Sequence, residues 1–210
     1  MSVLIKVLPR AFAEFDHLRA VKEKYRALRL HALKTEADNF GSRYEDEVEF
    51  LDQRWYERLQ NPKGATFIAF TKSTSAYGAE SIDKEDWIGT QTVLGPFVPA
   101  EAGKFIDVEE AAITGGAKPD GFRVFILVSF FVHENYRGRK VGVELLRAAE
   151  IYAGEQLSKI DGHYTGIFGL VANPKNARAL RLYKWMGFEK VGEAVDDDGS
   201  IDDYLQKTLV

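Results

Sequence analysis

Residues 132–143, VHENYRGRKVGV, are the stretch from which the fold of this chain is inferred. They follow a nearly continuous apolar run, 122–132, and lead into a segment from Val141 to Tyr152 whose apolar residues recur every three or four positions. The apolar run predicts a central strand covered on both faces, and the spacing after it predicts a helix. The sequence therefore predicts a strand, a basic turn and a helix in direct succession.

The turn itself combines two glycines with three cations: Gly138, Gly142, Arg137, Arg139 and Lys140. Free N–H groups and the dipole at a helix N-terminus favour an anion, glycine allows close approach of the backbone, and cations bind phosphate oxygens. A solvated basic loop explains the composition equally well. The Walker A and dinucleotide patterns are both excluded, because no Gly-Lys-Ser/Thr follows and the glycine spacing differs.

Upstream of this segment the patterns are weaker. We expect a short strand at 3–8, an amphipathic helix from Phe15, and neighbouring antiparallel strands at 66–71 and 87–94 that a polar loop separates. Ser42 and Glu45 match a capping box at the start of a second helix, which Asn61-Pro62 closes. Residues 95–121 show little periodicity, and we expect a surface insertion there.

Downstream, the pattern predicts a strand at 164–172 and a helix that starts at the N-cap pair Asn173-Pro174 and ends at Gly187. A hairpin of 188–195 and 201–209 follows, with an acidic turn at its tip. The whole chain, 1–210, is therefore expected to form a single mixed α/β domain.

The composition excludes several classes of protein. The 210 residues are 45% hydrophobic and 29% charged, as in ordinary globular proteins, and the net charge of −4 has the wrong sign for a generic nucleic-acid binder. Cysteine is absent, which rules out disulfides, thiolate metal sites and a cysteine nucleophile. The longest apolar stretch, 124–132, is too short to cross a bilayer, and Met1–Arg10 does not have the pattern of a signal peptide. We expect a cytoplasmic protein with no nucleic-acid or membrane partner, and we leave a homodimer open.

Two motifs carry a resemblance to a known family. The segment from Arg137 to Gly142 resembles the acyl-CoA motif of the GNAT superfamily of N-acetyltransferases, Arg/Gln-x-x-Gly-x-Gly/Ala, with Lys140 where the first motif glycine is expected. Residues 176–188, NARALRLYKWMGF, resemble the Asn-x-x-Ala-x-x-Leu-Tyr-x-x-x-Gly-Phe block of the same family. Either motif alone is weak, but both lie on a predicted strand–turn–helix. Residues 39–45 and 55–59 are also similar to a helical block that borders the acceptor site in some members.

The resemblance implies a mixed, mostly antiparallel central sheet flanked by helices, and acetyl-CoA as co-substrate. It places the pantetheine arm along the end of the strand, where an N–H near Val132 would bind the carbonyl oxygen, and it makes Tyr183 the group that protonates the departing thiolate. The expected cofactor-binding residues are Phe130, Phe131, Val132, Arg137, Gly138, Arg139, Lys140, Val141, Gly142, Val143, Asn176 and Tyr183.

The acceptor is expected to be a primary amine of a small molecule. A protein N-terminus or lysine, or a non-catalytic acyl-CoA-binding module, stay open as alternatives. Because there is no cysteine to carry the acyl group, direct transfer is favoured.

The base that takes the amine's proton is not fixed by the sequence. Glu45, Glu47 and Glu134 are candidates beside a water chain, and Glu45 has a competing role in the capping box. We expect carboxylates near the entrance to attract a protonated amine. The expected acceptor-site residues are Glu45, Glu47, Trp55, Trp87 and Tyr204. The four histidines, 17, 31, 133 and 163, show no metal-ligand spacing, so we expect no metal.

Overall fold

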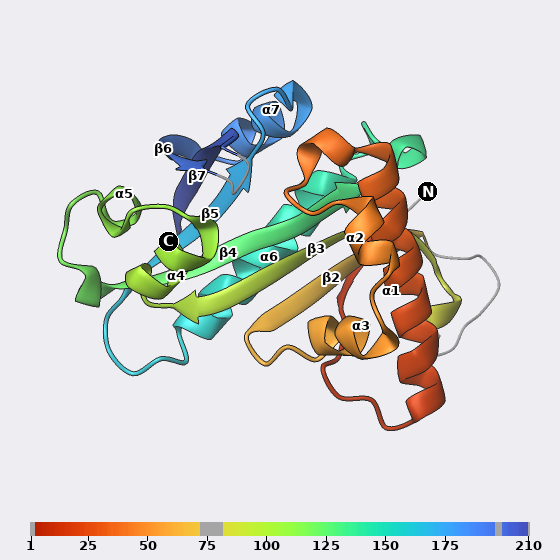
Figure 1. Cartoon of the computed structure of the whole chain (residues 1–210). Helices are drawn as coiled ribbons and strands as arrows, with labels where there is room; N and C mark the ends of the chain where they lie inside the picture. Colours follow the sequence, from red (N-terminus) through yellow and green to blue (C-terminus); the bar gives the residue numbers. More distant parts are fainter. Residues whose placement is uncertain (1–2, 72–81, 196–198, 210) are drawn as a thin grey trace. The chain divides into compact units, whose positions relative to one another are not determined.

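The computed structural model describes residues 3–71, 82–195 and 199–209 (Figure 1). The chain divides into two compact units. Unit 1 comprises 1–92 and 129–145, and unit 2 comprises 93–128 and 146–210. The predicted polar loop at 72–81 and the predicted acidic turn at 196–198 lie outside the described residues.

Unit 1 begins with an edge strand and three helices. Its strand β1 (Val3–Val7) pairs antiparallel with β2 (Gly64–Thr71), in a register that runs from Val3 opposite Thr71 to Val7 opposite Phe67. Between them lie α1 (Phe15–Thr35), η1 (Ala37–Asn39), α2 (Tyr44–Val48) and α3 (Asp52–Leu59). After η2 (Ile82–Lys84) the unit takes the first part of β3 (Asp86–Phe97), the last part of β4 (Phe122–Val132), η4 (Glu134–Tyr136) and the start of α6 (Val141–Leu157).

The core of unit 1 forms where α1 and α3 cover β2. Val21 and Tyr25 of α1, Trp55 of α3 and Ile68 of β2 are all buried in one cluster. The apolar positions of α1 recur every three to four residues, so they share one face of the helix, as its sequence predicts.

Unit 2 contains the remainder of β3 and β4, most of α6, and the C-terminal half of the sheet. Its further elements are α4 (Pro99–Ile106), α5 (Glu110–Thr114), η3 (Pro119–Gly121), β5 (Thr165–Ala172), α7 (Ala177–Trp185), β6 (Glu189–Val195) and β7 (Ile201–Leu209). Strand β4 pairs parallel with β5, and β7 pairs antiparallel with both β5 and β6. The predicted C-terminal hairpin is therefore confirmed.

The strands follow the order β1-β2-β3-β4-β5-β7-β6 in a seven-stranded sheet. The sheet is mixed and mostly antiparallel, and β4–β5 is its parallel pair. This confirms the predicted fold class. The predicted central strand is also confirmed, because Val124, Phe125 and Ile126 of β4 are completely buried.

Three local predictions were wrong. The segment 95–121, expected as a surface insertion with little periodicity, instead completes β3 and forms α4 and α5, whose Ala102 and Ile113 are buried in the core of unit 2. The single helix expected up to Asn61-Pro62 is split into α2 and α3, and Leu51 between them is exposed. Helix α7 starts after Asn176, three residues later than the predicted pair Asn173-Pro174.

Among the residues that the structure describes, none of the helices combines the length and the apolar character that a membrane span requires.

Candidate functional site

The basic segment between β4 and α6 forms a turn of alternating backbone handedness. We call residues 137–143 the cofactor turn. Gly138 has a φ of +74° and Lys140 a φ of +64°, both in the left-handed region, with Arg139 between them. Alternation of this kind directs successive backbone N–H groups toward one side and makes a concavity that binds anions. A Cβ on Gly138 would meet nothing within 4 Å, so the backbone there is open to a ligand.

The first turn of α6 adds further donors to this concavity. The N–H of Glu144 donates to the carbonyl oxygen of Lys140 (3.0 Å), which is the first bond of the helix ladder. The N–H groups of residues 141–143 therefore have no acceptor inside the helix. Together with the positive end of the helix dipole, they favour binding of an anion.

Lys140 occupies the place of the first motif glycine and keeps the backbone that a glycine would adopt. Its positive φ is unfavourable for a residue with a Cβ, whereas glycine accepts it freely. The side chain is exposed. The lysine therefore makes the backbone conformation of the turn less favourable in free energy and adds a positive charge, but it preserves the shape of the turn.

Arg137 holds the turn from inside the protein. Its Nε donates to the carbonyl oxygen of Val132 (2.9 Å), and its Nη2 lies 2.6 Å from Glu36 Oε1. The guanidinium thus joins the end of β4 to the segment after α1. Arg139 and Lys140, by contrast, are exposed, and the Arg139 guanidinium lies over the Tyr136 ring at 5.6 Å. These two side chains are better placed for a phosphate than Arg137 is.

Strand β4 changes its geometry near the expected acyl end of the site. Ser129, within the apolar strand, has a φ of +57°, which is rare for a residue other than glycine. The parallel ladder with β5 ends at Ile126 opposite Gly169, so residues 127–132 continue beyond it. A left-handed residue inside a strand indicates a β-bulge, and bulges are frequent beside active sites. A lone serine in an apolar run is the signal of this feature in the sequence, and no bulge was predicted from it.

At the end of β4, the polar backbone groups of Val132 and His133 point to opposite edges of the strand. The N–H of His133 donates to the carbonyl oxygen of Ile88 in β3 (2.9 Å), whereas the Val132 carbonyl accepts from Arg137. Successive residues of a strand direct their polar backbone groups to opposite edges. The N–H of Val132 therefore lies on the edge away from β3. Phe131, which precedes Val132, is buried, and Phe130 is partly exposed.

Tyr183 and Asn176 belong to α7 in unit 2. Tyr183 is buried, and its ring lies 5.9 Å from that of Phe188. Burial raises the pKa of Tyr183 far above its ordinary value, so the hydroxyl keeps its proton at neutral pH. Asn176 Oδ1 accepts the N–H of Ala179 (3.1 Å) and caps the helix. This capping bond accounts for Asn176 without a cofactor contact.

Glu47 is enclosed by two arginines. Its Oε1 accepts from Arg29 (2.8 Å) and Arg58 (2.9 Å), and its Oε2 accepts from the same two residues (3.1 and 2.7 Å). Burial alone would raise the pKa of this carboxyl, but the hydrogen bonds and charges of the two guanidinium groups outweigh it and lower the pKa to about 2. Glu47 is 1% exposed, and both of its oxygens are engaged. This geometry speaks against a role in recruiting the amine.

Glu45 lies exposed in the first turn of α2. The helix begins at Tyr44 with Arg43 at its N-cap, and no side chain caps it. The predicted capping box of Ser42 and Glu45 was therefore wrong. Its exposure keeps Glu45 a candidate base, and the competing structural role is removed.

The expected aromatic walls differ in burial. Trp55 is completely buried in the core of unit 1, and Tyr204 is completely buried in the core of unit 2, where its hydroxyl donates to Gln206 Oε1 (3.1 Å). Trp87 is partly exposed, and its Nε1 donates to the carbonyl oxygen of Ile82 (2.8 Å). Of the three, Trp87 keeps the surface that contact with a substrate requires.

Comparisons with known proteins agree with the two sequence motifs. The sequence model of the Acetyltransferase (GNAT) family matches residues 30–188. A search of curated protein sequences finds no significant match.

Similar solved structures include Arabidopsis thaliana NAA60 in complex with acetyl-CoA (15% identity, 99% of each chain covered, TM-score 0.56). A GNAT-family acetyltransferase from Staphylococcus aureus Mu50 (15% identity, 100% of each chain, TM-score 0.59) and an aminoglycoside 6'-acetyltransferase type Ii (13% identity, 99% of this chain and 97% of that chain, TM-score 0.56) are also similar. At these identities the similarity shows the fold alone.

Proposed function

The chain belongs to the GNAT acetyltransferase family, and from this premise we propose that it transfers an acetyl group from acetyl-CoA to the primary amine of a small molecule. The observation that carries the proposal is the cofactor turn, whose left-handed residues and helix N–H groups without an intrahelical acceptor form an anion cradle shortly after the end of β4. A solvated basic loop has no need of such a backbone.

The turn supplies most of the binding. The N–H groups of residues 138–143 hold the pyrophosphate, and Arg139 and Lys140 add positive charge at its rim. Arg137 fixes the turn against Val132 and Glu36. When bound, acetyl-CoA supplies an activated thioester.

The family motifs suggest two roles at the reacting atoms, one for the N–H of Val132 and one for the hydroxyl of Tyr183. The N–H of Val132 polarises the acetyl carbonyl and stabilises the negative charge that develops on its oxygen. The amine nitrogen bonds to the acetyl carbon as the carbon–sulfur bond breaks, and Tyr183 donates its hydroxyl proton to the sulfur. Because burial raises the pKa of Tyr183, this transfer requires a thiolate that is desolvated as well. Tyr183 then regains a proton from solvent, which completes the cycle. The amine's own proton passes to solvent or to Glu45.

Two alternatives to a small-molecule acetyltransferase are an enzyme that acetylates a protein N-terminus or lysine and a non-catalytic acyl-CoA-binding module. NAA60 has been solved with a bisubstrate analogue, and another similar structure is an aminoglycoside acetyltransferase. We favour a small amine for this chain because the exposed acid Glu45 and the partly exposed ring of Trp87 suit a compact cation. A non-catalytic acyl-CoA-binding module would bind the cofactor without turnover.

The test measures release of free thiol from acetyl-CoA in the presence of small amines, polyamines, aminoglycosides and peptides with free N-termini. We expect amine-dependent thiol release with small amines. Release with peptides alone would move the assignment to a protein acetyltransferase, and tight binding without release with any acceptor would favour the binding module.

The Tyr183→Phe variant tests the proton donor. Loss of a general acid costs about 10²–10⁴ in rate, so kcat should fall while acetyl-CoA affinity changes little. Tyr164→Phe removes a hydroxyl just before β5 from a residue that has no role in the proposed site, and serves as the matched control. Equal kcat for Tyr183→Phe and the control, with chemistry rate-limiting, would refute the role of Tyr183.

A further inference from the structure

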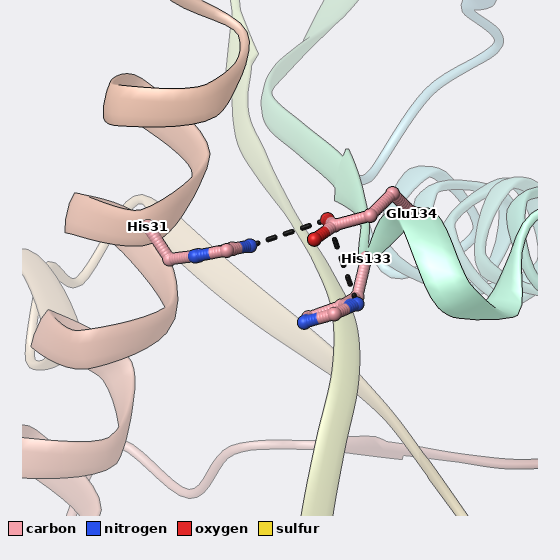
Figure 2. A group of neighbouring side chains, drawn as sticks. All are labelled: His31, His133 and Glu134. Atoms are coloured by element: carbon pink, nitrogen blue, oxygen red, sulfur yellow. Dashed lines mark hydrogen bonds and ion pairs between the residues drawn. The ribbon is translucent and has the colours of Figure 1, made fainter.

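Two histidines and a glutamate meet in unit 1 although they are far apart in the sequence (Figure 2). His31 lies on α1, while His133 and Glu134 follow β4 directly. Glu134 Oε2 is 3.2 Å from His31 Nε2 and 3.5 Å from His133 Nδ1. The two imidazole rings stack with their centroids 4.8 Å apart and their planes at 9°. Both rings therefore present a nitrogen to the same carboxylate oxygen.

The proposed transfer reaction does not use this cluster, because it passes the proton of the amine to solvent or to Glu45 and not to Glu134, which the sequence left as a candidate base. Arg137 already joins the end of β4 to the segment after α1, and the cofactor turn starts three residues after Glu134. All three side chains are partly exposed, so an ion from solvent reaches them without opening the core.

The donor set and its spacing match those of a transition-metal site. From these contacts we propose that His31, His133 and Glu134 bind a divalent transition-metal ion of the Zn²⁺ type. Imidazole nitrogen and carboxylate oxygen are ordinary zinc ligands, and three protein ligands leave a fourth position for water. Metal–ligand bonds of about 2.1 Å in a tetrahedron place neighbouring ligand atoms about 3.4 Å apart. The two distances to Glu134 Oε2 lie on either side of that value.

Binding requires a limited rearrangement. The three ligand atoms lie within 4.8 Å of one another, so the two imidazole nitrogens approach each other by rotation of the side chains. The N–H of Asn135 now donates to His133 Nδ1 at 3.3 Å, and the ion takes the place of this long contact. With both imidazoles neutral, the single carboxylate leaves one negative charge at the site, which favours a dication.

The ion's effect follows from where its ligands lie. His31 comes from α1, and the other two ligands come from the segment that leads into the cofactor turn. The bound ion therefore links these two elements of unit 1, and it stabilises the fold because the unfolded chain does not bring the three ligands together. Hard ions such as Mg²⁺ and Ca²⁺ prefer sites rich in oxygen and do not bind here.

The experiment titrates ZnCl₂ into metal-free protein and follows both the heat of binding and the unfolding temperature. We expect one zinc per chain and a higher unfolding temperature, with no effect of MgCl₂. His31→Ala, His133→Ala and Glu134→Gln should each weaken zinc binding at least about tenfold. His163→Ala, which removes an exposed histidine elsewhere in the chain, should bind zinc as the wild type does.

The titrations are made on variants whose far-UV spectra match the wild type. Glu134→Gln, an exposed isosteric change, keeps the test available if a histidine variant misfolds. No zinc binding by the wild type, or equal binding by the wild type and Glu134→Gln, would overturn the proposal and leave the cluster as an ion pair between α1 and the end of β4. Cobalt offers an independent check, because a tetrahedral Co²⁺ site absorbs visible light and loses that absorption when a ligand is removed.

Discussion

The cofactor turn and helix α2, both in unit 1, are rich in charged residues but differ in what they offer a ligand. In the turn the groups that we propose for binding belong to the backbone, and the cations Arg139 and Lys140 are exposed. In α2 the acid Glu47, which the sequence predicts for the acceptor site, is buried between Arg29 and Arg58. A charged residue in the sequence therefore indicates a ligand site only when burial and neighbouring charges leave it accessible.

Of the changes in the cofactor turn and in α2, replacement of Glu47 is expected to lower the free energy of unfolding most. Glu47→Ala leaves two guanidinium groups without their shared carboxylate, and breaking a buried pair of this kind costs about 3–5 kcal/mol in the free energy of unfolding. Glu45→Ala, an exposed change in the same helix, should stay within about 0.5 kcal/mol of the wild type. Urea unfolding measures both. Equal stability of the two variants would show that Glu47 is not held as the structure describes.

Acid pH should remove the same contribution without a mutation. The Arg29 and Arg58 pairs lower the pKa of Glu47 from its ordinary 4.5 to about 2 in the folded protein, despite the opposing effect of burial. The folded-state pKa lies below the unfolded one, so the stabilisation is complete above about pH 5 and is lost as the pH falls toward 2. It amounts to about 3 kcal/mol, because one pKa unit corresponds to about 1.4 kcal/mol.

This loss can be measured against Glu47→Gln, which cannot ionise at this position. The difference in unfolding free energy between wild type and Glu47→Gln should shrink between pH 5 and pH 2. A difference that stays constant over this range would contradict the lowered pKa.

A pair of glycines tests the backbone of the turn. A Cβ on Gly138 or on Gly154 would meet nothing within 4 Å, but Gly138 has a left-handed φ and Gly154 lies inside α6. Gly138→Ala should destabilise the protein by about 1 kcal/mol and weaken acetyl-CoA binding, whereas Gly154→Ala should stabilise it by about 0.5–1 kcal/mol. Thermal unfolding distinguishes the two signs. The same sign for both would show that the turn is not held in the left-handed conformation.

The smallest effect is expected at Lys140, where backbone and charge act in opposite directions. Lys140→Gly relieves a strained φ and should raise the unfolding free energy by up to about 1 kcal/mol. It also removes a charge from the rim, so acetyl-CoA binding should weaken at low salt and match the wild type at high salt, where surface charges are screened. Weaker binding at every salt concentration would mean that the lysine side chain, and not the backbone, holds the phosphate.

Features of the fold that depend on local residue types, such as apolar runs and glycines, could be predicted from the sequence. The limits of β4 follow from a nearly continuous apolar run, and Gly187 has the left-handed φ expected after α7. The cofactor turn was predicted for the same reason, because its glycines and the helix start behind it are local features. The place of Lys140 in the turn shows that even a departure from the motif keeps the shape.

Features that depend on long-range packing were not predictable. The spacing of α2 and α3 indicates which residues share a helix face, but not that Glu47 meets Arg29 or that Trp55 is completely buried. His31 and Glu134 are 103 positions apart, and no local pattern relates them. The break between α2 and α3 was missed because Leu51 has the apolar character of a core residue and yet is 80% exposed.

Binding of acetyl-CoA to the wild-type protein tests the central claim, that the backbone of the cofactor turn holds a pyrophosphate, most directly. At a hundredfold excess over its dissociation constant, a ligand that binds the folded state alone raises the free energy of unfolding by about 2.7 kcal/mol. We predict an increase of this size with acetyl-CoA, and a much smaller one at the same concentration of acetyl-pantetheine, which lacks the pyrophosphate. An unfolding temperature that acetyl-CoA leaves unchanged, or that both compounds raise equally, would contradict the account.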